Sequence, residues 1–309
     1  MKLFIIVALS AFSAAGCGSA ADRDAERRPF EIDPAEAGRA GAERSDNGLG
    51  MPFRYCPAGS FLMGASFGTG RGITGSEPVR VTISRGFWMG QNEVTQGQWL
   101  ELMGRSLSEQ RAEDPTQPRP VGDGTMRDHV GEGRHYPIYY VSHTEAEAFC
   151  RALTEAELTA GRIPAGWAYR LPTEAQWEYA CRAGSSTRTA FGDSLDSTQA
   201  NFDGTWPFGG AAKGPYLRET VPVGSYSPNA WGLDDMHGNV SEWCRDAYSE
   251  RLTGGVDPVT LDPGPMRVFR GGSWDLQGFQ CLSSTRSRGR VDTRGSGLGF
   301  RVALVFEGR

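Results

Sequence analysis

The sequence lacks several features that mark well-known functional classes. Positive charge is not in excess, because 37 Asp and Glu residues outnumber 32 Lys and Arg residues and the net charge is −5 at pH 7. Binding to nucleic acid requires clustered positive charge against the phosphates, so we exclude that class of partner. No segment repeats at a fixed period, and the four histidines lack the paired spacing of a metal site. These histidines are His129, His135, His143 and His237.

The apolar run at the N-terminus, Leu3 to Phe12, is too short to cross a bilayer. It follows a positive residue and precedes small residues that end at Cys17, which is the arrangement of an export signal. The residues before Cys17 resemble a bacterial lipoprotein cleavage box, in which the thiol is acylated; an ordinary secretory signal is the alternative. Gly18, in place of an aspartate, favours the outer membrane of a Gram-negative bacterium. We expect an exported protein of the outer membrane or periplasm, anchored by lipid and without a transmembrane helix in the mature chain.

Aromatic residues are scarce between residues 18 and 50, where Phe30 is the only one. This polar stretch cannot bury enough apolar surface to offset its chain entropy, so it is predicted to be a flexible tether. It links the signal peptide, residues 1–17, to a folded domain of residues 51–309. The partner we expect for such an anchored domain is an envelope protein or peptide.

Helical patterns are few, and turn-forming residues are many, with 42 glycines and 18 prolines. Short apolar or alternating segments at 57–64, 79–84 and 87–90 predict strands. The polar segment from Gly104 to Tyr136 predicts a long surface loop. Three capping boxes each predict the start of a helix. Together these patterns indicate an irregular α+β fold with little regular secondary structure. The capping pairs are Thr95 with Gln98, Ser142 with Glu145, and Thr173 with Gln176.

Five motifs occur in a fixed order along the domain, and in this order and spacing they resemble the formylglycine-generating enzyme (sulfatase-modifying factor) family. The resemblance implies an irregular fold related to C-type-lectin-like domains. It also implies kinship with copper-dependent oxidases that convert a sulfatase cysteine to formylglycine. The motifs are Pro57-Ala58-Gly59-Ser60-Phe61-Leu62-Met63-Gly64, Glu93-Val94-Thr95-Gln96-Gly97-Gln98-Trp99, Arg170-Leu171-Pro172-Thr173-Glu174-Ala175-Gln176-Trp177-Glu178-Tyr179-Ala180, Gly238-Asn239-Val240-Ser241-Glu242-Trp243, and Arg270-Gly271-Gly272-Ser273-Trp274 with Gly299-Phe300-Arg301.

The catalytic tail departs from the pattern of active family members. Their copper(I) is held by two cysteines five positions apart, and soft copper(I) favours such paired thiolates. Here the second position is Cys281 and the first is Leu276, which cannot bind a metal. The asparagine of active members is replaced by Gly297, whereas Ser273 is retained. Cys281 and Ser273 are the candidate catalytic residues, and copper is not expected.

Three functions remain open at this point. The chain is a residual protein-cysteine oxidoreductase that uses Cys281, a non-catalytic binding or scaffold module with a lectin-like pocket above Gly271 to Trp274, or an enzyme of another reaction on the same scaffold. Whether it is an enzyme is therefore left undecided by the sequence.

The resemblance also implies a calcium site formed by Asp235, Gly238, Val240 and Glu242. Two acidic side chains and two backbone carbonyls would supply oxygen ligands, which a hard cation prefers. The alternative is a turn whose acids are solvated. Asn201 matches the start of a second family calcium site, but the acid expected near residues 213–216 is missing.

Five cysteines remain besides Cys17, an odd number for an oxidising compartment. Cys150 and Cys181 match family positions that form disulfides in some members, but the partner positions are Arg286 and Val302 here. These thiols either pair differently or stay buried and reduced. The others are Cys56, Cys244 and Cys281.

An arginine cluster close to Cys281 predicts either a pocket for an acidic or peptide ligand or a solvated face with surface ion pairs. Its members are Arg286, Arg288, Arg290 and Arg294.

Overall fold

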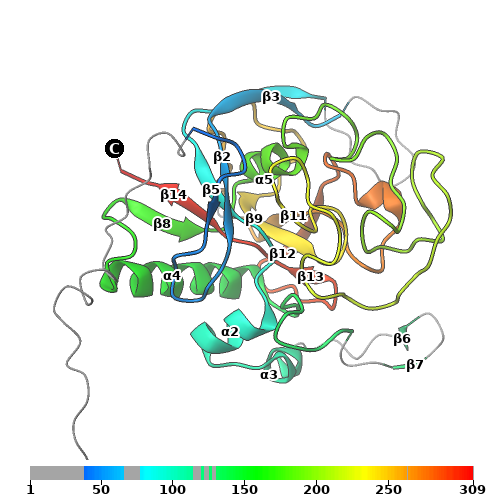
Figure 1. Ribbon diagram of the computed structural model, residues 1–309, viewed down its shortest axis with the longest axis horizontal. Helices are drawn as coiled ribbons and strands as arrows, with labels where there is room; N and C mark the ends of the chain where they lie inside the picture. Colours follow the sequence, from blue (N-terminus) through cyan, green and yellow to red (C-terminus); the bar gives the residue numbers. More distant parts are fainter. Residues whose placement is uncertain are drawn as a thin grey trace, which may run out of the picture. The chain divides into compact units, whose positions relative to one another are not determined.

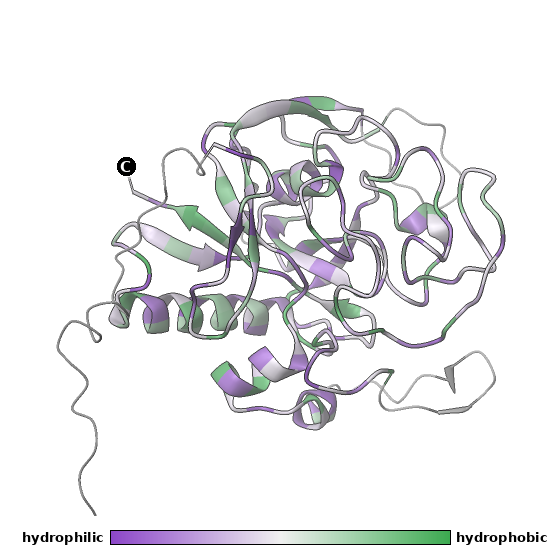
Figure 2. Cartoon of the chain, in the orientation of Figure 1, coloured by the Kyte–Doolittle hydropathy of each residue, from purple (hydrophilic) through white to green (hydrophobic). Residues whose placement is uncertain are grey.

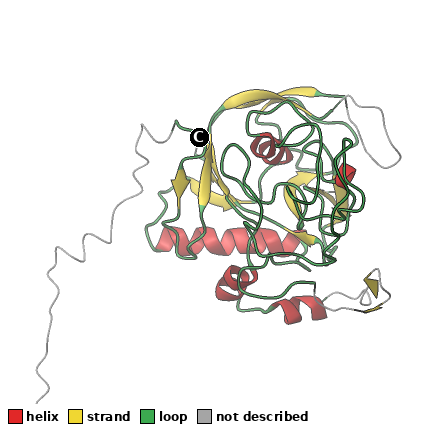
Figure 3. Ribbon diagram, turned by 45° about the vertical axis from the view of Figure 1, so that its right-hand side comes forward, coloured by secondary structure: helices red, strands yellow, loops and turns green. Residues whose placement is uncertain are grey.

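Loops make up most of the protein, with short strands and few helices set among them (Figure 3). The prediction of an α+β fold with little regular secondary structure is therefore confirmed. The predicted signal peptide, with Cys17, and His129 lie outside the described residues. The structure is a computed structural model that describes residues 38–65, 77–113, 130–262 and 264–308, together with the backbone of residues 120–121 and 125–126.

The largest sheet joins the start and the end of the domain. Its strand order is β1-β2-β5-β14-β8, so the C-terminal strand β14 lies between β5 and β8 and pairs antiparallel with both (Figure 1). Strand β5 is buried along its whole length, as expected for an unbroken apolar run. The strands are β1 (Glu43–Arg44), β2 (Phe53–Cys56), β5 (Phe87–Gly90), β14 (Ala303–Phe306) and β8 (Trp167–Arg170).

A four-stranded sheet carries the residues of the candidate site. Its order is β12-β11-β9-β13, so β9 runs between β11, which ends at Arg270, and β13, which precedes Arg301. A three-stranded sheet of order β10-β4-β3 contains the strands predicted at 57–64 and 79–84. The elements are β9 (Ser241–Ala247), β11 (Met266–Arg270), β12 (Ser287–Arg290), β13 (Leu298–Gly299), β3 (Gly59–Met63), β4 (Val79–Ile83), β10 (Gly255–Val256) and the short 3-10 helix η1 (Gly278–Gln280).

Three helices begin directly after the predicted caps, and each has both hydrogen bonds of its capping box. Helix α4 contacts strand β8, and hydrophobic and hydrophilic residues alternate along it (Figures 1 and 2). The buried residues of α4 include Ala146, Phe149 and Leu153, which are spaced three or four positions apart. The helices are α2 (Gln96–Met103), α4 (His143–Thr159) and α5 (Glu174–Arg182).

The segment from Gly104 to Tyr136 was predicted to be a loop throughout, and this is wrong in part. Helix α3 (Leu107–Ala112) follows a fourth capping box, between Ser106 and Glu109. A two-stranded ladder of β6 (Pro120–Val121) and β7 (Thr125–Met126) comes after it. Helix α3 has only two buried residues, so the apolar periodicity that reveals longer helices is nearly absent from its sequence.

The last part of the predicted tether is packed on the domain. Strand β1 pairs with β2, and the Gly48 amide donates a hydrogen bond to the buried Glu157 carboxylate of α4 at 2.9 Å. Residues between 41 and 48 thus contact the domain, although they fall within the predicted tether of residues 18–50. Polar hydrogen bonds hold this segment, and a sequence pattern based on apolar residues does not detect them. In the described part of the chain, no helix has the length and apolar content needed to cross a membrane.

Candidate functional site

The tail turn, Gly271–Trp274, depends on its two glycines. Both have left-handed backbone angles, with φ of 95° at Gly271 and 75° at Gly272. A Cβ at Gly272 would lie 2.5 Å from the Sγ of Cys281, so the thiol packs directly against the turn. The Gly-Gly pair therefore serves both the turn geometry and the close approach of Cys281.

Cys281 is fully buried. Its thiol lies 3.8 Å from the backbone oxygen of Gln277, and burial raises its pKa well above the ordinary value. A thiol with a raised pKa is neutral at physiological pH and a poor nucleophile or metal ligand. In this conformation Cys281 is a packed side chain and does not present a reactive thiolate.

Leu276 lies in the loop that leads to Cys281. Its backbone oxygen accepts a hydrogen bond from the Asp203 amide at 2.8 Å, and its own amide donates to the Ser273 oxygen at 3.0 Å. The backbone of the first copper position is thus held in a bonded turn, but its side chain offers no sulfur. Copper(I) held by paired thiolates does not fit the residues present.

Ser273 and Asp275 lie directly beside Gly297. The Ser273 hydroxyl donates a hydrogen bond of 2.6 Å to the Asp275 carboxylate. A Cβ at Gly297 would lie 2.8 Å from the Ser273 Oγ and 3.1 Å from the Asp275 Oδ1. The space next to residue 297 is therefore occupied by Ser273 and Asp275, and an asparagine there would require both to move.

Tyr216 covers the tail turn, a contact that the sequence did not predict. Its ring stacks on Trp274 with a centroid distance of 6.2 Å and an interplanar angle of 21°, and Trp274 is only 4% exposed. The guanidinium of Arg218 lies 5.7 Å from the Tyr216 centroid. Burial, with the nearby carboxylates of Asp275 and Asp203, raises the pKa of Tyr216. Tyr216 thus lies against Trp274 at the place where the sequence predicted a pocket above the tail turn.

The loop from Asp235 to Glu242, here called the cation loop, brings buried acids together. Glu242 on β9 is fully buried and accepts two hydrogen bonds of 2.6 Å from Arg301. It also accepts one of 2.7 Å from the Trp177 indole of α5. Asp235 accepts the Gly224 amide at 2.7 Å, and burial raises its pKa to about 7.

Glu93 adds a third carboxylate that the sequence presented only as part of a motif. It is 1% exposed, and its Oε1 accepts a hydrogen bond of 3.2 Å from the Asn239 amide group. Within the described residues its Oε2 has no hydrogen-bond partner. Burial raises its pKa well above the ordinary value, with the Asp235 charge as the next cause, and Arg301 opposes the shift. The sequence signal that could have identified Glu93 was its position, as an acidic residue between a predicted strand and the cap of a predicted helix.

Asn201 also reaches the cation loop, although the sequence assigned it to a separate second site. Its backbone oxygen accepts the Asn239 amide at 2.8 Å, and its side-chain amide bonds the Glu219 oxygen at 2.9 Å. Gly238 has φ of 88°, and a Cβ there would lie 2.2 Å from the Asn201 oxygen. Among the described residues the Asn201 Oδ1 is buried without a partner.

A calcium ion is compatible with this charge distribution. Three carboxyl groups interact electrostatically with one guanidinium, that of Arg301, which cannot compensate all of them if they ionise together, so a further cation would make their ionisation less costly. In the described part of the chain, no three His, Cys, Asp or Glu side chains are close enough to enclose a metal by themselves. A cation here would therefore need backbone carbonyls such as those of Gly238 and Val240, as the sequence resemblance implies.

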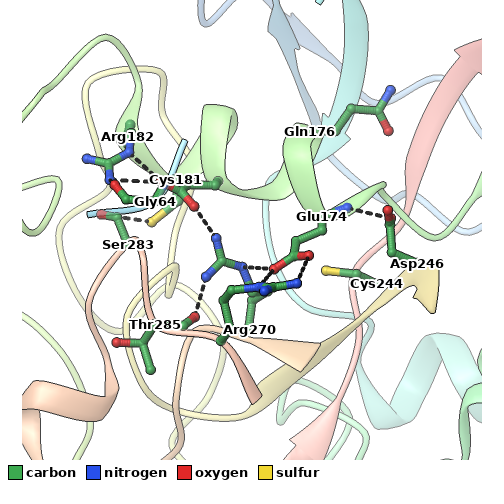
Figure 4. Close-up of polar contacts among 12 residues, drawn as sticks. Gly64, Glu174, Gln176, Cys181, Arg182, Cys244, Asp246, Arg270, Ser283 and Thr285 are labelled. Carbon is green, nitrogen blue, oxygen red and sulfur yellow. Dashed lines mark hydrogen bonds and ion pairs between the residues drawn. The ribbon is translucent and has the colours of Figure 1, made fainter. Parts of the chain in front are cut away.

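Arg270 of the Arg-Gly-Gly-Ser-Trp motif is the centre of a separate buried ion network. Its guanidinium pairs with Glu178 and Glu174 of α5 and donates to the Thr285 oxygen (Figure 4). Arg182 binds the other oxygen of Glu178 at 2.8 Å. The network ties the tail turn to helix α5.

The predicted arginine cluster near Cys281 is not a single patch. Arg286 pairs with Glu174 at 2.7 Å inside the Arg270 network. Arg288 lies over the Tyr248 ring at 4.5 Å. The other two pair with different acids, Arg290 with Asp292 and Arg294 with Glu145. Arg286 and Arg288 thus share the Tyr248 ring, whereas Arg290 and Arg294 are engaged elsewhere.

All five cysteines in the described residues are buried free thiols. Cys181, at the end of α5, has its Sγ 3.5 Å from the Ser283 hydroxyl and 3.7 Å from the His237 ring. At one of the two family partner positions, Arg286 pairs with Glu174 instead. Of the two alternatives from the sequence, the buried and reduced state is the one in this structure.

The order of these features along the chain matches a known family. Residues 53–305 match the model of the sulfatase-modifying factor enzyme 1-like domain. The chain belongs to this family. It is 31% identical over 320 residues to the formylglycine-generating enzyme of Streptomyces coelicolor, covering 89% of this chain and 95% of that enzyme.

A further relative and a solved structure are also similar to this chain. The formylglycine-generating enzyme of Mus musculus is 31% identical over 180 residues, which cover 55% of this chain and 44% of the mouse enzyme. The match thus spans less than half of the mouse protein. The structure of PvdO from Pseudomonas aeruginosa superposes with a TM-score of 0.69 at 26% identity, covering 86% of this chain and 98% of PvdO.

Proposed function

We propose that this formylglycine-generating-enzyme-like domain does not oxidise cysteine and acts as a calcium-binding recognition module of the cell envelope. The observation that carries the proposal is the pair Leu276 and Cys281. One position has no sulfur, and the other has a fully buried thiol with a raised pKa. Copper(I) needs paired thiolates, and redox exchange needs a second sulfur, so neither requirement is met.

The closed space at Gly297 supports the same proposal. A polar group that active family members carry at this position is missing, and the Ser273–Asp275 hydrogen bond occupies its place. Tyr216 covers Trp274 on the outer side. A substrate cysteine would have to displace these side chains to approach Cys281. A recognition surface formed around the filled tail turn requires no such displacement, and its partner would be an envelope protein or peptide.

The test uses the reaction of active relatives. Incubating the purified protein with a Cys-X-Pro-X-Arg peptide and copper(I) is expected to give no aldehyde, as measured by mass spectrometry after hydrazide capture. The Streptomyces coelicolor enzyme is the positive control. The same experiment on Leu276→Cys is expected to give no more than a trace of product, because Cys281 remains buried beneath the tail turn. Aldehyde from the unaltered chain, lost in Cys281→Ala, would overturn the proposal and favour the oxidoreductase alternative.

We infer that calcium binds the cation loop through Asp235, Glu242 and the carbonyls of Gly238 and Val240. The ion would offset the buried negative charge of these acids and of Glu93. Its role there is structural: Arg301 orients Glu242 through two hydrogen bonds, and Gly224 orients Asp235 through one. Asn201 lies beside the same loop and contributes a buried, unpartnered Oδ1 among the described residues.

We infer further that the protein is exported and anchored by lipid on Cys17, the residue that follows the small-residue stretch of the signal. Cells that express the full-length chain are expected to incorporate an alkyne-labelled fatty acid into it, detected by click chemistry on a gel. Cys17→Ser should lose the label, while Cys56→Ser, a buried cysteine of the domain, should keep it. Equal labelling of the Cys17→Ser variant and the unaltered protein would argue against the anchor.

A further inference from the structure

The cation loop, Asp235–Glu242, is hydrogen-bonded to several parts of the tail. The Gly238 amide donates to the Gly271 oxygen at 2.8 Å, and the Trp274 amide donates to the Asn239 oxygen at 2.9 Å. The Ser241 amide donates to the Gly297 oxygen at 2.8 Å. Backbone groups of one short loop thus hold both ends of the tail turn and the segment beside it.

A side chain of the same loop holds the Cys281 segment. The Ala190 amide donates to the Nε2 of His237 at 3.0 Å, so the Nδ1 carries the proton. That Nδ1 donates to the Cys281 oxygen at 2.6 Å. His237 is 1% exposed, so this contact is made in the interior, where a lost hydrogen bond is costly.

We propose that cation occupancy of the loop controls access to Cys281 and the tail turn. The inference rests on the calcium site of the proposed function and adds the regulation of the tail by that site. The bonds from Gly224 to Asp235 and from Arg301 to Glu242 hold the two acidic side chains at the ends of the closed loop, beside the carbonyls of Gly238 and Val240. An ion that binds this closed arrangement therefore favours the closed state over an open one.

The expected opening is local because different contacts hold the rest of the core. Cys281 packs against Gly272 of the tail turn on one side and against a small apolar cluster on the other, so release of the turn opens a path to the thiol from the turn side. Cys150 is equally buried but lies on helix α4, which contacts β8 and α2. It becomes accessible only when that part of the domain unfolds. The two thiols thus report local opening and global unfolding separately.

The experiment measures iodoacetamide labelling of each cysteine in the full-length protein by peptide mass spectrometry, in calcium and in a calcium chelator. Cys281 is expected to react about 5- to 150-fold faster in chelator, the range of typical coupling free energies. Cys150 is expected to keep the same slow rate. Equal Cys281 rates in the two conditions would overturn the inference, and so would a parallel rise at Cys150.

Two variants and a matched control sharpen the test. Asp235→Asn removes a charged ligand of the calcium ion, so the labelling rate of Cys281 should be the same in calcium and in chelator. Asp262→Asn, the same change at an exposed aspartate, should keep the full calcium effect. His237→Phe keeps a ring but removes the bond to the Cys281 oxygen, so it should leave Cys281 reactive even with calcium. If calcium still slowed the labelling of Cys281 in the His237→Phe protein, the hydrogen bond from His237 would not be the link between the cation loop and Cys281.

Calcium titration by calorimetry separates this inference from the proposed function. Binding without a change in Cys281 labelling overturns only the coupling. Absence of binding overturns both the coupling and the calcium part of the proposed function. The peptide oxidation assay tests the loss of cysteine oxidation independently of both.

Discussion

Replacing Arg301 by methionine is expected to lower the free energy of unfolding by about 3–5 kcal/mol, because removing one partner of a buried ion pair leaves the other charge uncompensated. Arg301 is fully buried and makes two hydrogen bonds to Glu242 of β9. It also donates to the backbone oxygens of Gly90, Gln91 and Asp234. One side chain thus joins the four-stranded sheet, the five-stranded sheet and the start of the cation loop. Urea denaturation monitored by tryptophan fluorescence measures the effect.

Two control variants separate the effect of the buried guanidinium from that of its charge alone and from that of breaking an exposed ion pair. Arg301→Lys keeps the charge but loses the two-pronged geometry, so its loss is expected to be smaller than that of the methionine variant. Arg290→Met breaks an ion pair whose side chains are 61% and 67% exposed, and should cost at most about 1 kcal/mol. If Arg301→Met cost no more than Arg290→Met, the guanidinium would not be the link between the sheets that the structure describes.

Replacing Gly238 by alanine is expected to cost more than about 3 kcal/mol, the sum of left-handed backbone strain and a clash in a packed interior. The residue has φ of 88°, and its Cβ would lie 2.2 Å from the backbone oxygen of Asn201. A backbone atom cannot move aside as a flexible side chain would, so the loop itself must shift. Thermal unfolding measures the loss of stability, and calcium titration of the folded fraction measures the accompanying loss of affinity.

Gly255 provides the matched control for this substitution. Its φ is 104°, and a Cβ there would meet no atom within 4 Å. Gly255→Ala therefore carries the backbone strain without the clash and should cost about 1 kcal/mol. Similar losses in the two variants would mean that the contact between Gly238 and Asn201 is not tight.

The sequence predicted the parts of the fold that depend on local chemistry. Three capping boxes placed the starts of α2, α4 and α5, because a capping box is formed by residues only three positions apart. Helix α3 has the same signal at Ser106, but its short and largely exposed face gave no periodicity to support it. Strand β1 was missed because its partner in the sheet lies further along the chain and its own two residues are charged.

The features of the candidate site also divide into those that the sequence predicted and those that only the structure shows. The residue types at positions 276, 281 and 297 were visible from the motif order, and they weakened the case for copper chemistry. That Tyr216 covers Trp274 was not visible, because the two residues are far apart in sequence and share no motif. The arginine cluster was visible as a run of charge, but Arg286, Arg288 and Arg294 each have a partner distant in sequence that spacing cannot identify.

The sequence by itself determined the family, the irregular fold and the absence of a second sulfur at Leu276, since these follow from residue identity and order. Only the tertiary structure decided that Cys281 is buried, that Glu93 joins Asp235 and Glu242, and that the cation loop holds the tail turn. The physical reason is that burial and charge compensation depend on which distant segments meet. The Gly-Gly-Ser-Trp turn is encoded locally, but the hydrogen bonds that keep it closed come from a loop about thirty residues earlier.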